Sequence, residues 1–225
     1  MEERKAVALK KEEFAIREHI KKYLGKGKVS KVTIEYTPVG EKIIITTHKP
    51  GLVIGRKGER IEEMTYFLKK KFGKENPHIE IEEVKEPEFD AQIMADDIAL
   101  GLERFGPLKF KVIAYRALQK IIDAGAAGVE IRLNGKLPSS RAKSWRFAYG
   151  YLKKTGEPSK LVDRAQARAE TKPGTVGVKV NILSPHVIMK DRIQITEELL
   201  KRLRENSDVQ EVLDKKTTKK VREKK

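Results

Sequence analysis

The sequence contains no cysteine, little aromatic residue content and no long apolar run, and these absences exclude whole classes of protein. Without cysteine, the 225 residues can form neither a disulfide nor a zinc site that needs thiolates. No stretch of about 18 apolar residues is available to cross a membrane, and no apolar signal segment follows the charged N-terminus. We therefore expect a soluble, intracellular protein without a membrane partner.

Positive charge is what the sequence has in excess. It carries 49 Lys and Arg against 33 Asp and Glu, a net charge of +16, which favours a polyanionic partner and, first of all, a nucleic acid. The excess is densest in residues 201–225, where 10 basic residues stand against 5 acidic ones. Because such a block repels itself, we expect the end of the chain to be disordered until a polyanion neutralises it.

No pattern in the sequence indicates catalysis, a cofactor or a metal ion. The four histidines are scattered, without a close pair or an HExxH motif. The motif of P-loop NTPases and the nucleophile motif GxSxG are both absent. We expect a protein that is not an enzyme, with no catalytic residue, no cofactor and no metal site.

The first half of the chain has the pattern of a small α+β domain. Apolar residues at helical spacing from Phe14 to Leu24 predict a helix that ends at Gly25. A longer helix is expected between Ile61 and Gly73. Segments rich in β-branched residues predict strands over 31–36, 42–47 and 78–84.

The second half predicts two helices followed by four strands. The helices are expected over 89–105 and 107–125, where Pro107 begins the second and Gly125 ends it. Strict alternation of apolar and polar residues predicts half-buried strands over 129–134 and 176–182, with two more over 143–153 and 162–170. These patterns indicate an antiparallel sheet with one face covered by the helices. We expect the aromatic residues of 145–151 to pack in its core rather than stack on bases.

The sharpest local motif is Gly55-Arg56-Lys57-Gly58, between a short predicted helix at 51–54 and the longer helix that follows. Its glycines permit tight turns and let a phosphodiester approach the main chain without meeting a Cβ atom. The amides that open the following helix supply donors and partial positive charge for a phosphate, and Arg56 and Lys57 add full charges. GxxG alone is a weak signal, but its context resembles the loop of KH domains, which holds about four nucleotides by their backbone.

The element order, with an extra helix before the hairpin, is similar to type II KH domains over about residues 16–85. Three further segments, Val129 to Gly135 (VEIRLNG), Ser140 to Trp145 (SRAKSW) and Thr175 to Val180 (TVGVKV), extend the similarity. Together they resemble the family of universal small-subunit ribosomal protein three, in its archaeal form, over about residues 5–190.

This resemblance implies a structural protein of the small-subunit head, in the cytoplasm. Its partners would be small-subunit ribosomal RNA, neighbouring head proteins, and messenger RNA at the channel through which the messenger enters. In bacterial relatives, the counterpart of the helix at 109–120 carries closely spaced basic residues that contact the messenger. Here Val112 and Ile113 are apolar, which argues against a messenger-unwinding role.

The candidate RNA-binding residues lie in the GxxG loop and just after it, in the helix at 109–120, and in the second sheet with the segment before its second strand. No catalytic, cofactor-binding or metal site is expected. The alternating pattern places Arg132, Arg146, Arg164, Arg168 and Lys179 on the open face of the second sheet, where they would bind phosphate or simply be solvated. The full set of candidates is Gly55, Arg56, Lys57, Gly58, Arg60, Lys109, Lys111, Arg116, Arg132, Arg141, Lys143, Arg146, Arg164, Arg168 and Lys179.

We therefore expect an α+β protein with a type II KH domain (1–88), a two-helix domain with a four-stranded antiparallel sheet (89–190), and a basic C-terminal tail (191–225), helical at first and then disordered. The polar, proline-containing segment 85–88 marks the boundary. Two alternatives remain for the function. One is a free-standing KH factor in RNA processing, and the other is a DNA-repair lyase or nuclease.

Overall fold

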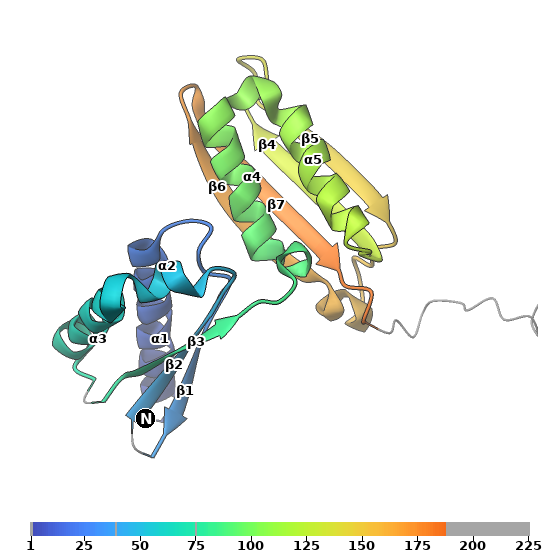
Figure 1. Cartoon of the computed structure of the whole chain (residues 1–225). Coiled ribbons are helices and arrows are strands. Elements are labelled where there is room, and N and C mark those ends of the chain that lie inside the picture. Colours follow the sequence, from blue (N-terminus) through green and yellow to red (C-terminus); the bar gives the residue numbers. More distant parts are fainter. Residues whose placement is uncertain (1, 39, 75, 188–225) are drawn as a thin grey trace, which may run out of the picture. The chain divides into compact units, whose positions relative to one another are not determined.

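The computed structural model of the chain describes residues 2–38, 40–74 and 76–187, which build two β-sheets (Figure 1). Each sheet has its own cluster of buried apolar side chains. The boundary expected after residue 88 stays a prediction. The segment 191–225 lies outside the described residues, as do the helix and the disorder expected there.

The first sheet belongs to a KH-like domain with the predicted order of elements. Helix α1 (Glu2–Leu24) precedes the antiparallel strands β1 (Lys31–Thr37) and β2 (Gly40–Thr47). Helix α2 (Pro50–Ile54), the 3-10 turn η1 (Arg56–Gly58) and helix α3 (Glu59–Phe72) follow. Strand β3 (His78–Glu83) then pairs in parallel with β2, so the strand order is β1-β2-β3.

Helix α1 begins much earlier than its apolar pattern indicated. Ile16, Ile20 and Leu24 are at most 2% exposed and form its buried stripe, whereas Phe14, which we included in that stripe, is 65% exposed. Residues 3–12 are exposed on every side and still helical. They are mostly Ala, Leu, Lys, Arg and Glu, which are strong helix formers, so this part of the helix does not need an apolar stripe to extend from the packed part.

Two helices cover one face of the second sheet, as predicted (Figure 1). They are α4 (Ala91–Phe105) and α5 (Phe110–Asp123). The strands are β4 (Gly128–Gly135), β5 (Lys143–Gly150), β6 (Asp163–Thr171) and β7 (Gly174–Leu183). Every neighbouring pair is antiparallel and the order is β5-β4-β7-β6, so β5 and β6 form the edges.

Local chemistry explains where α4 and α5 begin. The carboxylate of Asp90 accepts hydrogen bonds from the backbone N–H groups of Gln92 and Ile93, at 2.9 and 3.1 Å, and so caps the first turn. The helix therefore begins at Ala91 rather than at Phe89. A short 3-10 helix, η3 (Pro107–Lys109), takes up the proline, so α5 itself begins three residues later than predicted.

The alternating pattern correctly predicted which strand residues enter the core. Val129, Ile131 and Leu133 of β4 are at most 1% exposed, and the apolar residues of β7 from Val176 to Ile182 are equally buried. Of the aromatic residues expected in the core, two pack there and two do not. Phe147 is 7% exposed and the Trp145 ring packs 5.2 Å from that of Phe110, but Tyr149 and Tyr151 are exposed. The core prediction is wrong for these two because they lie at the end of an edge strand and just beyond it.

Candidate nucleic-acid interface

The GxxG loop joins α2 to α3 and its backbone needs glycine at both ends. Gly55 has φ 76° and ψ −172°, a conformation that is essentially restricted to glycine. A Cβ atom there would lie 2.9 Å from Cγ of Arg60. Gly58 has φ 85° and ψ 1°, in the left-handed region, and a Cβ atom there would meet nothing within 4 Å. The main chain at Gly58 is therefore open to an approaching ligand.

Lys57 takes a left-handed conformation without being glycine. Its φ of 53° makes it the one non-glycine residue with positive φ among the residues that the structure describes. Such a conformation costs about 1–2 kcal/mol, and strained residues of this kind cluster at functional sites. Both Arg56 and Lys57 are exposed, and neither forms an ion pair within the described ranges. Their charges are therefore available to a phosphate.

Arg60, also a candidate for RNA binding, is exposed and held by a contact within the domain. Its Nη1 donates a 2.7 Å hydrogen bond to the carbonyl oxygen of Leu52, so the side chain crosses Gly55 and ties α3 to α2. A hollow of about 510 Å³ beside the loop is lined in part by Leu52, Gly55 and Arg60. Glu59, at the start of α3, also lines it and partly offsets the positive charge at this end of the helix.

The open face of the second sheet brings together five of the candidate cations. The register pairs Arg132 of β4 with Arg146 of β5 on one side and with Lys179 of β7 on the other. Arg164 and Arg168 of β6 pair with residues of β7 that point to the same face, opposite the helices. All five are partly or fully exposed. Their shared face is thus a property of the strand register, and their contact with RNA stays a prediction.

At the centre of this open face lies Glu130, a residue that the pattern presented as an ordinary solvated one. Its side chain is 2% exposed. Oε1 accepts hydrogen bonds from Nε and Nη2 of Arg132, at 3.0 and 2.9 Å, from Nζ of Lys154 at 3.2 Å, and from Nε of Arg146. Oε2 accepts from Nδ2 of Asn181 at 3.4 Å. One buried carboxylate therefore binds three cationic side chains. We call Glu130, Arg132, Arg146 and Lys154 together the Glu130 cluster.

The carboxylate of Glu130 stays ionised over a wide pH range. Burial raises the pKa of this carboxyl, but the hydrogen bonds from Arg132, Lys154 and Arg146 outweigh burial and lower the pKa to about 2. With one negative and three positive charges, the cluster keeps two positive charges in excess. Lys154 was not among the candidates. The alternation that correctly places Glu130 on the polar face carries no information on how crowded that face is.

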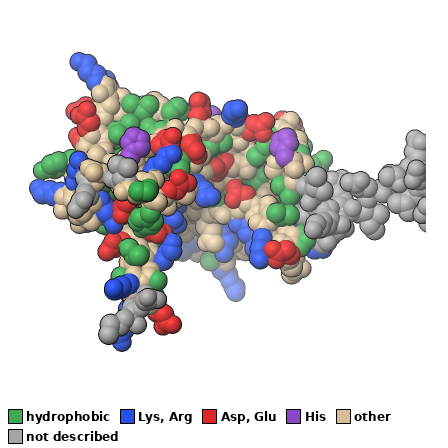
Figure 2. Space-filling model, turned by 90° about the horizontal axis from the view of Figure 1, so that it is seen from below, with side chains coloured by type: hydrophobic (Ala, Val, Ile, Leu, Met, Phe, Trp, Pro, Cys, Tyr) green, Lys and Arg blue, Asp and Glu red, His purple; other side chains and the backbone are tan. Residues whose placement is uncertain are grey.

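The remaining candidates are more widely spread. Lys143 is exposed at the start of β5, and Arg141 is exposed in the loop just before it. Lys109 lies over the ring of Phe105, with Nζ 5.8 Å from its centroid, and Lys111 lies over Trp145 at 4.8 Å. Arg116 lies on α5, beside Ile113. On the face drawn in Figure 2, Lys and Arg are interspersed with Asp and Glu rather than gathered into one patch.

Two negative findings apply to the part of the chain that the structure describes. No group of three or more His, Asp or Glu side chains there has the arrangement of a metal site. None of the helices in that part has the length and apolar character needed to span a membrane.

Comparison with known proteins finds a matching family model in each half of the chain. Residues 15–89 match the family model of the KH domain, and residues 98–182 match that of the C-terminal domain of ribosomal protein S3. Small ribosomal subunit protein uS3 of Methanocaldococcus jannaschii is 45% identical over 184 residues, 81% of this chain and 88% of that protein.

Two further relatives carry the same name. The protein of Methanobrevibacter smithii is 38% identical over 80% of this chain and 72% of its own length. That of Methanococcus maripaludis is 37% identical over 92% of this chain and 98% of its own length. These archaeal relatives are named as ribosomal proteins, with no enzyme activity in their names, in agreement with the expectation drawn from the sequence. The chain belongs to the family of small ribosomal subunit protein uS3.

Proposed function

We propose that this chain is a structural constituent of the small ribosomal subunit and binds ribosomal RNA without a chemical step. The relatives' names state the subunit for those proteins. The observation that carries RNA binding for this chain is the open face of the second sheet, where a buried Glu130 holds Arg132, Arg146 and Lys154 together. Arginine and lysine at fixed spacing suit the phosphates of an RNA backbone.

The GxxG loop provides the second contact. Its exposed Arg56 and Lys57 supply charge, and the open main chain at Gly58 admits a phosphodiester to the amides at the start of α3. Because these contacts address the backbone of the nucleic acid rather than its bases, we expect affinity with little sequence preference from this loop.

The location of the chain within the small subunit is also part of the proposal, and the family resemblance supports it. The chain would lie in the head of the cytoplasmic small subunit, beside neighbouring head proteins and near the channel through which messenger RNA enters. A messenger-unwinding role is not included, because Val112 on the exposed side of α5 is apolar where bacterial relatives carry charge.

Sedimentation of cell extract tests the proposal against its main alternative. We expect the chain to migrate with small subunits after a wash at high salt, because many phosphate contacts and protein contacts act together. Presence only in the soluble fraction would favour a free-standing KH factor. Incubation of the purified chain with abasic DNA addresses the second alternative, and we expect no strand cleavage.

A further inference from the structure

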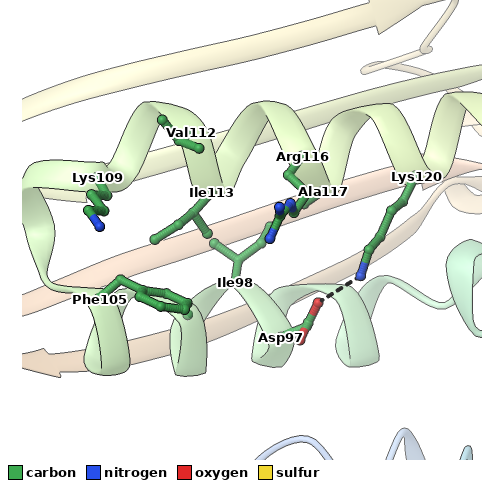
Figure 3. A pocket seen from close by; sticks show the side chains of 10 residues that line it. Asp97, Ile98, Phe105, Lys109, Val112, Ile113, Arg116, Ala117 and Lys120 are labelled. Atoms are coloured by element: carbon green, nitrogen blue, oxygen red, sulfur yellow. Dashed lines mark ion pairs between the residues drawn. The ribbon is translucent and has the colours of Figure 1, made fainter.

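A groove between α4 and α5 lies on the side of these helices that faces away from the sheet, and RNA binding as proposed above does not use it. Its volume is about 330 Å³. Figure 3 shows Ile113 and Ile98 meeting in its floor, with Phe105 and Val112 toward one end. Gly101 lets α4 and α5 pack closely, since a Cβ atom at this position would lie 3.2 Å from Cγ2 of Ile113. We call it the α4–α5 groove.

Apolar side chains around the groove are unusually exposed. Of the residues that line it, Phe105 is 54% exposed and Val112 66%. Single exposed apolar residues are normal, but two large ones that line the same groove beside Ile113 suit an interaction surface. Phe105 ends α4 and Val112 lies in the first turn of α5.

Cations rim this apolar floor, with Lys109 at the Phe105 end and Arg116 between Ile113 and Lys120 (Figure 3). Lys109 and Arg116 both line the groove and are exposed, and neither forms an ion pair with any described residue. At the far end, Lys120 is instead joined to Asp97, with Nζ and Oδ2 3.6 Å apart (Figure 3). The groove thus combines aliphatic surface with two unpaired positive charges, which calls for a ligand that is apolar and acidic together.

Three other occupants fit this chemistry less well. A nucleobase would bring donors and acceptors onto a floor of aliphatic side chains that leaves them unpaired. A second copy of the chain that docked through the same groove would bring Lys109 and Arg116 against their own counterparts, so that like charges would face each other. Residues 188–225 of this chain carry 12 Lys and Arg against 8 Asp and Glu, so the segment as a whole has the wrong sign of charge. Its one stretch with Glu beside apolar residues, 195–200, is distinguished from another protein by the crosslinking experiment below.

We propose that the α4–α5 groove docks a segment of another protein in which an apolar side chain is flanked by Asp or Glu. The apolar side chain packs on Phe105, Val112 and Ile113, and the carboxylates pair with Lys109 and Arg116. This assignment replaces the expectation that Lys109 and Arg116 bind RNA. This proposal goes beyond RNA binding. Protein docking in the α4–α5 groove and RNA binding by the chain can each be true without the other.

Photo-crosslinking in living cells tests the assignment without requiring assembly into a particle. The full-length chain carries p-benzoylphenylalanine at Val112, and a control carries it at Tyr66 of α3, which is 65% exposed. Mass spectrometry identifies the crosslinked segment. We expect a protein segment with acidic residues beside the crosslinked one, formed from position 112 and not from position 66.

Charge variants complete the test. Lys109→Glu with Arg116→Glu should lower the crosslinking yield at least about tenfold, because like charges then face each other. Lys109→Gln with Arg116→Gln should lower it less, and Lys69→Glu with Lys70→Glu on α3 should leave it unchanged. Thermal unfolding of each variant verifies that it folds. A crosslink to RNA, to the chain itself, to a segment without acidic residues, or none at all would overturn the proposal, as would a yield insensitive to charge reversal.

Discussion

The carboxylate of Glu130 and the guanidinium of Arg132, two residues apart on β4, are joined through a single oxygen. Both Nε and Nη2 of Arg132 donate to Oε1 of Glu130, at 3.0 and 2.9 Å. Alternate residues of a strand lie on one face, so this pair runs along the strand rather than across it. The remaining hydrogen bonds to Glu130, from Arg146, Lys154 and Asn181, reach it from other segments of the chain.

Replacing Glu130 by Gln should destabilise the fold. The amide keeps the shape but removes the only negative charge of the Glu130 cluster and turns N–H donors toward cations. We expect the free energy of unfolding to fall by about 1–3 kcal/mol, measured by urea denaturation. The matched control is Glu157→Gln, which removes an exposed ion pair with Lys160 and should cost less than about 0.5 kcal/mol. Equal effects of the two substitutions would contradict a structural role of the cluster.

The same residue makes stability depend on pH in the acid range. The pKa of Glu130 is lowered from 4.5 to about 2 in the folded protein, so this carboxylate stabilises the fold fully above pH 4.5. As pH falls from 4.5 through 2, protons bind the unfolded chain first and the contribution is lost. The difference in free energy of unfolding between the wild type and Glu130→Gln should therefore shrink over this window. A difference that stays constant down to pH 2 would mean that the charge of Glu130 is not what stabilises the cluster.

Reversing the charge of the GxxG loop should weaken RNA binding and its dependence on salt. Each phosphate contact with single-stranded RNA contributes about −0.7 to the slope of log affinity against log salt. Arg56→Asp with Lys57→Asp should therefore make the slope shallower by about 1.4 if each residue contacts one phosphate. Filter binding of small-subunit ribosomal RNA at several salt concentrations measures it. Lys69→Asp with Lys70→Asp, at the far end of α3, is the control. A slope and affinity equal to those of the wild type would exclude the loop from the interface.

The two glycines of the loop should respond differently to alanine. Gly58→Ala adds a Cβ atom into open space and carries only the left-handed strain, about 1–2 kcal/mol. Gly55→Ala meets the same kind of strain in a rarer conformation and also displaces Arg60, which disturbs its hydrogen bond to the Leu52 carbonyl. We expect Gly55→Ala to be the more destabilising in thermal unfolding. The reverse order would show that the Arg60 contact is not maintained in solution.

The fold was predictable wherever burial follows a simple period. Val129, Ile131 and Leu133 alternate with polar residues, so their strand and its buried face follow from the sequence. Helix α1 shows the limit of this reasoning. Its exposed first half carries no apolar stripe, and only helix propensity continues it to Glu2.

The candidate site was less predictable, for physical reasons. The exposed state of Arg56 and Lys57 follows from their place in a glycine loop. By contrast, the convergence of Arg146 and Lys154 on Glu130 depends on strand register and on a segment beyond the end of β5, and neither is visible in local sequence. At the α4–α5 groove, Phe105 and Ile113 belong to the apolar patterns that predict the two helices. Such a pattern does not show where a helix's apolar stripe reaches the edge of the core.

The Glu130 cluster also affects what RNA binding costs. A free arginine or lysine side chain loses up to about 2 kcal/mol of rotamer entropy when it is immobilised. In this protein, Arg132, Arg146 and Lys154 are already restrained by one buried oxygen before any ligand arrives. Most of the ordering therefore takes place when the chain folds, and a phosphate that docks on this face meets cations in a preorganised arrangement.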